Sequence, residues 1–177
     1  RNNHVGGVLW LTGLSASGKT TIASKVERKL FDKGYNIYML DGDNLRDGLN
    51  SNLGFSDQDR NENIRRASEV ANILAESGFI VIASFITPTK QDREIAKSNN
   101  KTKFYEVYIS ASIKKCEERD PKGLYKKARL GEIKDFTGIS AAYDEPKNPD
   151  ITIDTEILSE IESSDILSKY IEKNFPI

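Results

Sequence analysis

The sequence has few of the residues from which disulfide frameworks and zinc sites are built. Its 177 residues include one cysteine, Cys116, and one histidine, His4. A single cysteine forms no internal disulfide, which indicates a reducing compartment, and this pair is too small a set for a tetrahedral zinc site. We expect Cys116 to be a packed helix residue rather than a nucleophile, since no histidine is at hand to activate it.

The sequence also lacks an excess of one charge and a long apolar run. Lys and Arg number 26, Asp and Glu number 27, and the formal net charge is −1. No global basic field attracts nucleic acid or a membrane surface, and no apolar run approaches the roughly 20 residues that span a bilayer. We expect a cytoplasmic protein with no nucleic-acid or membrane partner. Because the chain begins at Arg1 rather than Met, this expectation leaves open an organellar targeting segment ahead of it.

What the sequence does contain is a glycine-rich loop with the appropriate flanks. Residues 13–20 fit G-x-x-x-x-G-K-[ST], the phosphate-binding loop, although a chance glycine-rich turn is the alternative. An apolar run at 8–11 predicts a buried strand before the loop, and Ile22, Val26 and Leu30 predict a helix after it. Amide groups and a helix N-terminus would then surround one anion, with the Thr20 hydroxyl as a Mg²⁺ ligand. The residues expected to bind ATP here are Gly13, Leu14, Ser15, Ala16, Ser17, Gly18, Lys19, Thr20 and Thr21.

Apolar runs alternate with amphipathic segments along the rest of the chain. Strands are predicted at 8–11, 36–40, 79–83, 104–109 and 151–153, and helices at about 57–77, 91–97, 112–119 and 163–174, with a loop at 44–55. This order predicts an α/β fold, a doubly wound and mostly parallel five-stranded sheet with helices on both faces, in a single domain 1–177. Ligands of such sheets bind beyond the carboxyl ends of the strands, where residues 13–20, 41–43 and 84–87 should converge.

Two aspartates follow the second predicted strand. Asp41 and Asp43 are two residues apart, so in extended geometry both side chains face the same way. Beside a phosphate loop they could ligate Mg²⁺ or accept the proton of an attacking hydroxyl group, whereas the third strand ends without a carboxylate. A solvated Asp-Gly turn is the alternative. We expect both aspartates to be catalytic and metal-binding residues, and which of them is the base stays open.

A second set of residues suits an anionic acceptor. The set consists of Arg46, Arg60, Asn63 and Arg66. The last three share one helix surface, and the planar guanidinium group of arginine matches phosphate or sulfate oxygens. Phe55 and Phe85 are candidate stacking platforms for a base. The alternatives are a solvated helix face, on which Glu62 pairs with Arg66, and aromatic rings packed in the core.

Residues 120–136 are polar and strongly basic and lack a clear apolar period. This composition predicts a mobile surface segment that acts as a lid. Closure of such a lid over polyanionic nucleotides would exclude water as phosphoryl transfer begins. An exposed charged loop without this role is the alternative.

The motifs together resemble adenylylsulfate (APS) kinase over nearly the whole chain. Besides the phosphate loop, the resemblance depends on Asp-Gly-Asp-Asn-Leu-Arg at 41–46, Asn-Ile-Arg-Arg at 63–66 and Ser-Phe-Ile-Thr-Pro at 84–88. It extends to Arg-Asp-Pro-Lys-Gly-Leu-Tyr at 119–125 and Phe-Thr-Gly-Ile at 136–139. The phosphate loop alone is unspecific, whereas the strings at 41–46 and 119–125 are highly specific.

The resemblance implies transfer of the ATP γ-phosphate to the 3′-hydroxyl group of APS, giving 3′-phosphoadenylylsulfate (PAPS) and ADP, and a homodimer. It implies that Arg119 borders the ATP adenine, with Mg²⁺ at Thr20 and an Asp. It places Thr87 where many relatives carry Ser, a candidate phosphoenzyme position, although direct in-line transfer needs no covalent intermediate. The APS-binding set is Asp43, Arg46, Phe55, Arg60, Asn63, Arg66, Phe85, Ile86, Thr87, Lys122, Gly123, Leu124 and Phe136.

Three rival functions remain at this stage. Another small-molecule kinase of the same fold would not need the arginine set with two aromatic residues. A nucleotide-binding module without catalysis would not need Lys19, Thr20 and both aspartates. A bifunctional enzyme that also makes APS would need a further domain, for which 177 residues leave no room.

Overall fold

The alternating order of strands and helices is confirmed in the computed structural model, which describes residues 3–177. The strands are β1 (Gly7–Thr12), β2 (Ile37–Asp41), β3 (Ile80–Ser84), β4 (Lys103–Ser110) and β5 (Ile151–Asp154). The helices are α1 (Lys19–Phe31), α2 (Gly42–Asp47), α3 (Asp57–Glu76), α4 (Lys90–Ser98), α5 (Ile113–Arg119), α6 (Leu124–Arg129) and α7 (Glu160–Asn174). No helix within residues 3–177 is long and apolar enough to cross a membrane.

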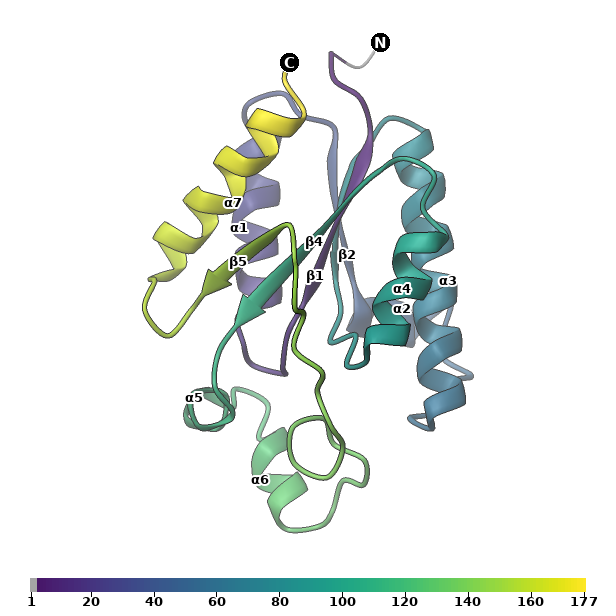
Figure 1. The fold of residues 1–177 in the computed structure, drawn as a ribbon, viewed down its shortest axis with the longest axis vertical. Coiled ribbons are helices and arrows are strands. Elements are labelled where there is room, and N and C mark those ends of the chain that lie inside the picture. Colours follow the sequence, from purple (N-terminus) through teal and green to yellow (C-terminus); the bar gives the residue numbers. More distant parts are fainter. Residues whose placement is uncertain (1–2) are drawn as a thin grey trace.

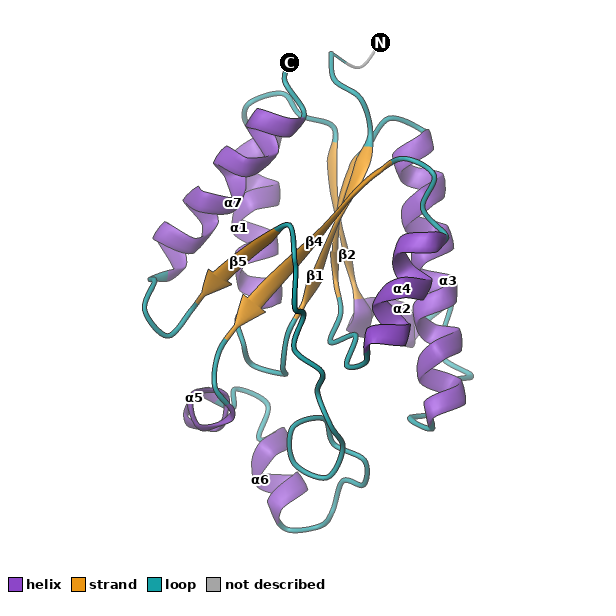
Figure 2. Cartoon of the chain, in the orientation of Figure 1, coloured by secondary structure: helices purple, strands orange, loops and turns teal. Residues whose placement is uncertain are grey.

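The five strands form one sheet in the order β2-β3-β1-β4-β5, and every neighbouring pair is parallel. All the carboxyl ends therefore lie at one edge, which faces away from the two chain ends (Figure 1). Helices cover both faces of the sheet (Figure 2). This is the predicted doubly wound architecture. In such sheets ligands bind at the edge formed by the carboxyl ends of the strands.

Alternation along the central strand separates the core into two layers. Leu9 and Leu11 of β1 pack with α1 and α7, whereas Val8 and Trp10 pack with α3 and α4. Because successive side chains of a strand point to opposite faces, a strand covered on both faces is apolar at every position. This explains the continuous apolar run 8–11, all four residues of which are fully buried.

Two helices were missed by the sequence prediction. The expected loop 44–55 was wrong at its start, because α2 already begins at Gly42, where the Asp41 carboxylate accepts a hydrogen bond from the amide group of Asp43. The expected surface segment 120–136 contains α6, with Tyr125 buried in a small cluster beside Leu14 and Cys116. The prediction that Cys116 is packed in a helix was right, and burial raises the pKa of its thiol.

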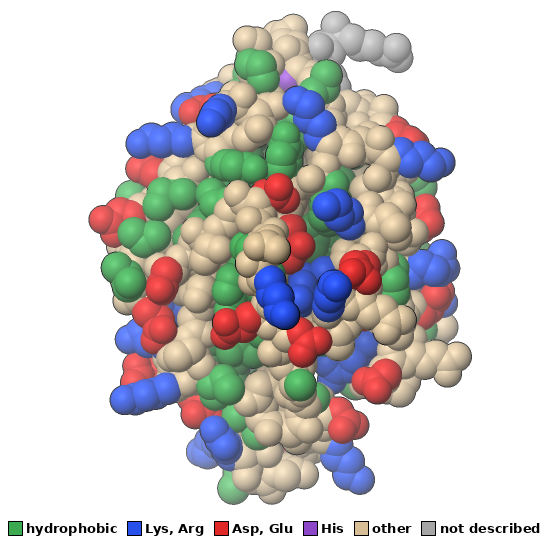
Figure 3. Space-filling model, viewed as in Figure 1, with side chains coloured by type: hydrophobic (Ala, Val, Ile, Leu, Met, Phe, Trp, Pro, Cys, Tyr) green, Lys and Arg blue, Asp and Glu red, His purple; other side chains and the backbone are tan. Residues whose placement is uncertain are grey.

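Helices α5 and α6 lie beyond the carboxyl ends of the strands, at the far end of the molecule from the termini (Figure 1). The Tyr125 hydroxyl group donates a hydrogen bond of 2.9 Å to the carbonyl oxygen of Ser15, so α6 is fastened to the phosphate loop. Positive and negative side chains are interspersed over the face seen in Figure 3, as the nearly balanced charge predicts.

Candidate active site

The phosphate loop runs from the end of β1 to the start of α1, as its sequence predicts. Gly18 has a φ of 104°, a conformation that L side chains rarely adopt. A Cβ atom at Gly13 would lie 2.4 Å from the carbonyl oxygen of Ile109 and 2.8 Å from the Ser17 hydroxyl oxygen. The two glycines of the motif are therefore required by the path of the backbone.

Lys19 lies inside this loop. Its ammonium group donates hydrogen bonds of 2.9 Å and 2.7 Å to the carbonyl oxygens of Gly13 and Leu14. Burial lowers the pKa of Lys19 to about 8, while the negative charges of Asp41 and Asp43 act in the opposite direction. A phosphate bound in the loop would supply the counter-charge that the buried ammonium group needs.

An oxygen cluster connects the loop with the end of β2. The Thr20 hydroxyl group donates a hydrogen bond of 3.0 Å to the Asp41 carboxylate and lies 3.4 Å from the Ser84 hydroxyl oxygen. Within residues 3–177 no group of three His, Cys, Asp or Glu side chains could hold a metal ion. One carboxylate with one or two hydroxyl groups nevertheless fits Mg²⁺, which takes hard oxygen ligands and completes its shell with water and nucleotide phosphates.

The two aspartates have different surroundings, and the predicted extended geometry was wrong. Asp41 ends β2 and is buried, whereas Asp43 lies in the first turn of α2 with 71% of its side chain exposed. Asp43 instead forms an ion pair with Lys122. Of the two aspartates, Asp41 contacts Thr20, so the structure separates a carboxylate at the phosphate loop from one that is paired with Lys122.

Three of the predicted acceptor residues lie in or between α2 and α3: Arg46 in α2, Phe55 in the loop and Arg60 in α3. The Arg46 guanidinium group lies 4.4 Å from the centre of the Phe55 ring and donates to the carbonyl oxygens of Leu53 and Gly54. Burial, followed by the positive charge of Arg60, lowers the pKa of Arg46. The two arginines thus lie close enough for their positive charges to repel each other.

Arg60 joins α3 to the chain after α6. It donates to the carbonyl oxygens of Phe55 and Asp135 and to the Thr137 hydroxyl oxygen. Phe55 is 62% exposed although Arg46 lies over its ring, so it keeps surface on which a ligand could stack. This part of the predicted acceptor site is therefore assembled from residues 46–60 and residues 135–137, which are distant in the sequence.

Other members of the predicted set have structural contacts. The Asn63 side chain is buried and accepts a hydrogen bond from Asn50. Arg66 pairs with Glu62 at 2.8 Å, the alternative that helical spacing allowed. Phe85 is buried and stacks on Trp10 with ring centres 4.9 Å apart. A role for these three residues toward APS stays a prediction.

The turn after β3 is buried. The Ile86 carbonyl oxygen accepts a hydrogen bond from the Thr12 hydroxyl group, and Thr87 is 1% exposed with a φ of 47°. The Thr87 hydroxyl oxygen accepts a hydrogen bond of 2.9 Å from the indole N–H of Trp10. A hydroxyl group in these surroundings is poorly placed for phosphorylation, and the phosphoenzyme hypothesis finds no support in its geometry.

The segment 119–136 contributes further contacts at the same edge. Lys122 precedes Gly123 and Leu124, the start of α6, and its ion pair with Asp43 raises its pKa. Phe136 packs edge-on against the Tyr125 ring at 5.0 Å. Arg119 donates to the carbonyl oxygens of Ala16, Ser17 and Thr155, so it borders the loop expected to hold ATP.

Three further residues touch the phosphate loop or Thr20, namely Ser84, Tyr125 and Thr155. Ser84 ends β3 and belongs to residues 84–87, which the sequence predicts at this edge without giving Ser84 a role of its own. Thr155 was missed, although it directly follows β5, so the rule that ligands gather at the carboxyl ends of parallel strands could have found it. Tyr125 gave no such signal, because its contact depends on how α6 folds back.

A phosphate loop at the tip of a parallel sheet, a neighbouring carboxylate and a nearby pair of arginines define a phosphotransferase of the P-loop kinase class. A family model described as "Adenylylsulphate kinase" matches residues 5–154. The chain therefore belongs to the adenylylsulfate kinase family.

Individual relatives agree with this assignment. The chain is 53% identical over 174 residues to an adenylyl-sulfate kinase of Bacillus pumilus, covering 98% of this chain and 88% of the relative. It is 50% identical over 175 residues to the adenylyl-sulfate kinase of Staphylococcus epidermidis, with the same two coverages. Its fold matches the APS kinase CysC of Mycobacterium tuberculosis, solved in complex with AMPPNP and APS, with a TM-score of 0.92. That match has 47% identity and covers 95% of this chain and 98% of the other.

Proposed function

We infer that this protein transfers the γ-phosphate of ATP to the 3′-hydroxyl group of APS and releases PAPS and ADP. Family membership supports this activity, and one observation carries it. The phosphate loop and the arginine-rich acceptor region open at the same sheet edge, and Asp41 contacts the loop through Thr20. Direct in-line transfer between two nucleotides needs this arrangement and no covalent intermediate.

On the donor side, amide groups of the phosphate loop bind the β- and γ-phosphates, and Lys19 neutralises the charge that develops between them. Thr20 and one of Asp41 and Asp43 would hold Mg²⁺, directly or through water, and Asp41 is the one that contacts Thr20. The bound ion supplies charge neutralisation on the phosphate oxygens. Arg119 borders the adenine end of the donor.

On the acceptor side, Asp41 accepts the proton of the 3′-hydroxyl group as that oxygen attacks, and Asp43 is the second candidate. Arg46 and Arg60 bind the phosphosulfate group, because two guanidinium forks match its oxygens. Phe55 stacks on the adenine of APS.

The remaining residues complete the acceptor side in this proposal. They are Asn63, Arg66, Phe85, Ile86, Thr87, Lys122, Gly123, Leu124 and Phe136. Residues 120–136 close over both nucleotides as a lid.

Mg²⁺ dependence, a homodimer and a cytoplasmic location complete the proposal. Oxygen ligands at Thr20 and Asp41 support Mg²⁺ dependence, and family resemblance supports the homodimer. The cytoplasmic location follows from the reducing compartment that a single cysteine indicates. Activity with and without EDTA and light scattering of the purified protein test the metal and the dimer.

A panel of acceptors tests the activity. ADP release is measured with Mg²⁺-ATP and each of APS, AMP, a nucleoside and shikimate. We expect release with APS alone. Release with another acceptor would indicate a different small-molecule kinase, and ATP binding without release from any acceptor would indicate a binding module.

A further inference from the structure

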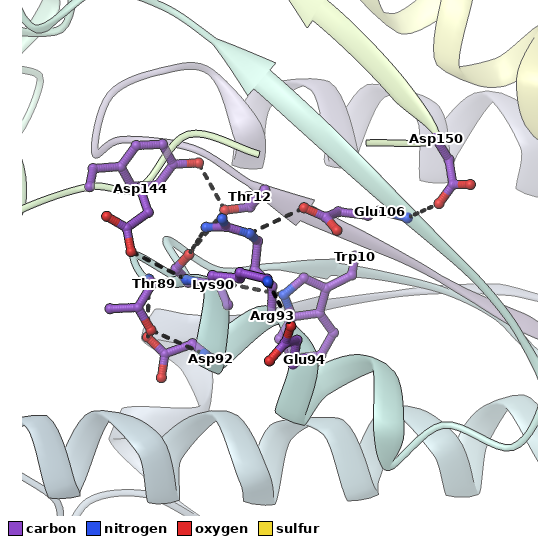
Figure 4. A network of polar contacts seen from close by, with 12 residues as sticks. Trp10, Thr12, Thr89, Lys90, Asp92, Arg93, Glu94, Glu106, Asp144 and Asp150 are labelled. Atoms are coloured by element: carbon purple, nitrogen blue, oxygen red, sulfur yellow. Dashed lines mark hydrogen bonds and ion pairs between the residues drawn. The ribbon is translucent and has the colours of Figure 1, made fainter. Parts of the chain in front are cut away.

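A buried ion pair lies behind the active site, between α4 and β4. The Arg93 side chain is 7% exposed, and its Nε atom lies 3.2 Å from the Glu106 carboxylate, which is 22% exposed (Figure 4). Burial raises the pKa of Glu106, and the positive charge of Arg93 opposes this. A buried ion pair is weak evidence for stability, because desolvation offsets most of its attraction, so a role in geometry is the better explanation.

The other end of the Arg93 guanidinium group reaches the turn after β3. Its Nη1 atom donates a hydrogen bond of 3.2 Å to the carbonyl oxygen of Thr87. Thr87 has a φ of 47°, and a β-branched residue rarely adopts this left-handed conformation unless its surroundings impose it. Arg93 is one of the groups that impose it, and Glu106 fixes the direction in which Arg93 points.

This turn sets the position of site residues on both sides. The carbonyl oxygen of Ile86 accepts a hydrogen bond of 2.7 Å from the Thr12 hydroxyl group and one of 3.4 Å from the Gly13 amide group. The Phe85 ring lies against Gly42, where an added Cβ atom would be 3.1 Å from it. A shift of residues 85–87 would therefore move the backbone beside Asp41 relative to the phosphate loop.

Neighbouring contacts fix the same turn from other directions. The Asp144 amide group donates a hydrogen bond of 2.8 Å to the Pro88 carbonyl oxygen. The Tyr143 hydroxyl oxygen lies 2.9 Å from the Thr12 hydroxyl oxygen. A capping box between Thr89 and Asp92 holds the start of α4, from which Arg93 projects. The Thr87 carbonyl oxygen also lies 3.3 Å from the Thr12 hydroxyl group of β1, and Arg93 is the charged group that connects this carbonyl with Glu106 of β4.

We propose that Arg93 is a positioning residue for phosphoryl transfer: its guanidinium group, held by Glu106, keeps residues 85–87 in place through the Thr87 carbonyl. Arg93 does not touch either nucleotide in this proposal. The proposal rests on the proposed function for its kinetic effect, but its structural effect has an independent readout. Trp10 is the only tryptophan of the chain, stacks on Phe85 and donates to Thr87, so its fluorescence reports the turn.

The test compares Arg93→Gln and Arg93→Lys with Lys90→Gln. Lys90 lies on the same helix, and its exposed side chain pairs with Glu94 alone among residues 3–177, so its replacement is the matched control. Each variant is assayed for Trp10 emission, binding of AMPPNP, and kcat and KM for APS per folded molecule. Arg93→Gln is expected to shift Trp10 emission, to lower kcat/KM for APS about tenfold or more, and to bind AMPPNP within about twofold of wild type.

Arg93→Lys, which retains a donor but not the fork, should recover part of the activity, and Lys90→Gln should match wild type. If Arg93→Gln does not fold, the same measurements on Arg93→Lys test the proposal. Wild-type emission and wild-type kcat/KM in a folded Arg93 variant would overturn the proposal, leaving Arg93 a purely structural residue. Absence of APS phosphorylation in wild type and Lys90→Gln would instead overturn the proposed function, and Trp10 emission would still test the position of the turn.

Discussion

The Thr20 hydroxyl group donates a hydrogen bond of 3.0 Å to the Asp41 carboxylate. This bond connects α1, the helix that follows the phosphate loop, with the end of β2. The second oxygen of the same carboxylate accepts the amide group of Asp43. Asp41 is therefore fixed by two donors at the place where donor and acceptor are proposed to meet. A carboxylate held in this way is pre-positioned for proton transfer or for a metal ion.

Asp41→Asn is expected to lower kcat about 100-fold or more while leaving AMPPNP affinity largely intact. Asparagine is also a good N-cap, so α2 should keep its start and the variant should fold. Steady-state ADP release with APS and a titration with AMPPNP provide the two quantities. Asp43→Asn is the matched comparison, and a variant of Asp41 that turns over like wild type would refute its assignment as the base.

Affinity for ATP should fall as the pH rises through the pKa of Lys19. The pKa of free Lys19 is about 8, lowered by burial, and bound phosphates raise it. Binding is therefore strong below pH 8 and weakens above it, by about tenfold between pH 7 and pH 9. Calorimetric titration with AMPPNP measures this. Lys19→Arg keeps its charge and should lose the pH dependence, and an equal dependence in both proteins would contradict the explanation.

Lys122→Ala should raise KM for APS about tenfold with little effect on stability. The ion pair of Lys122 with Asp43 is exposed on both sides, so its loss should change the free energy of unfolding by less than about 1 kcal/mol. Thermal melting and APS kinetics separate the two effects. A large loss of stability with unchanged KM would show that Lys122 is a structural residue and not part of the acceptor site.

Gly13→Ala should destabilise the protein by about 1–3 kcal/mol and abolish tight AMPPNP binding, because the new methyl group collides with the Ile109 carbonyl oxygen. Gly48→Ala is the control for the collision, since a Cβ atom there meets nothing within 4 Å, and it carries only the backbone strain of an alanine at φ −131° and ψ −95°. Urea denaturation of both variants gives the two free energies. Equal, small effects would mean that the loop tolerates a side chain at Gly13.

The fold was predictable because its signals are local. The apolar runs at β1 and β3, the phosphate loop and the long helix α3 each follow from neighbouring residues. Even the start of α7 had a signal that the prediction did not use: Ser159 and Glu162 form a capping box, so the helix begins at Glu160 rather than at residue 163.

The part of the site that sequence could not supply depends on packing between distant segments. The burial of Phe85 against Trp10 and the contact of Tyr125 with Ser15 join residues 75 and 110 positions apart. Asp43 was placed beside Asp41 on the assumption of extended backbone, whereas the Asp41 cap turns the chain into α2. Local patterns do not report such contacts, because each requires the folded sheet edge to exist first.

The most direct test of the account is to follow the label from [γ-³²P]ATP during incubation of the purified protein with APS and Mg²⁺, and to locate the labelled phosphate in the product. The account predicts one labelled PAPS for each ADP formed, with the label on the 3′-oxygen. Unlabelled APS after prolonged incubation, or label on any other position, would contradict it.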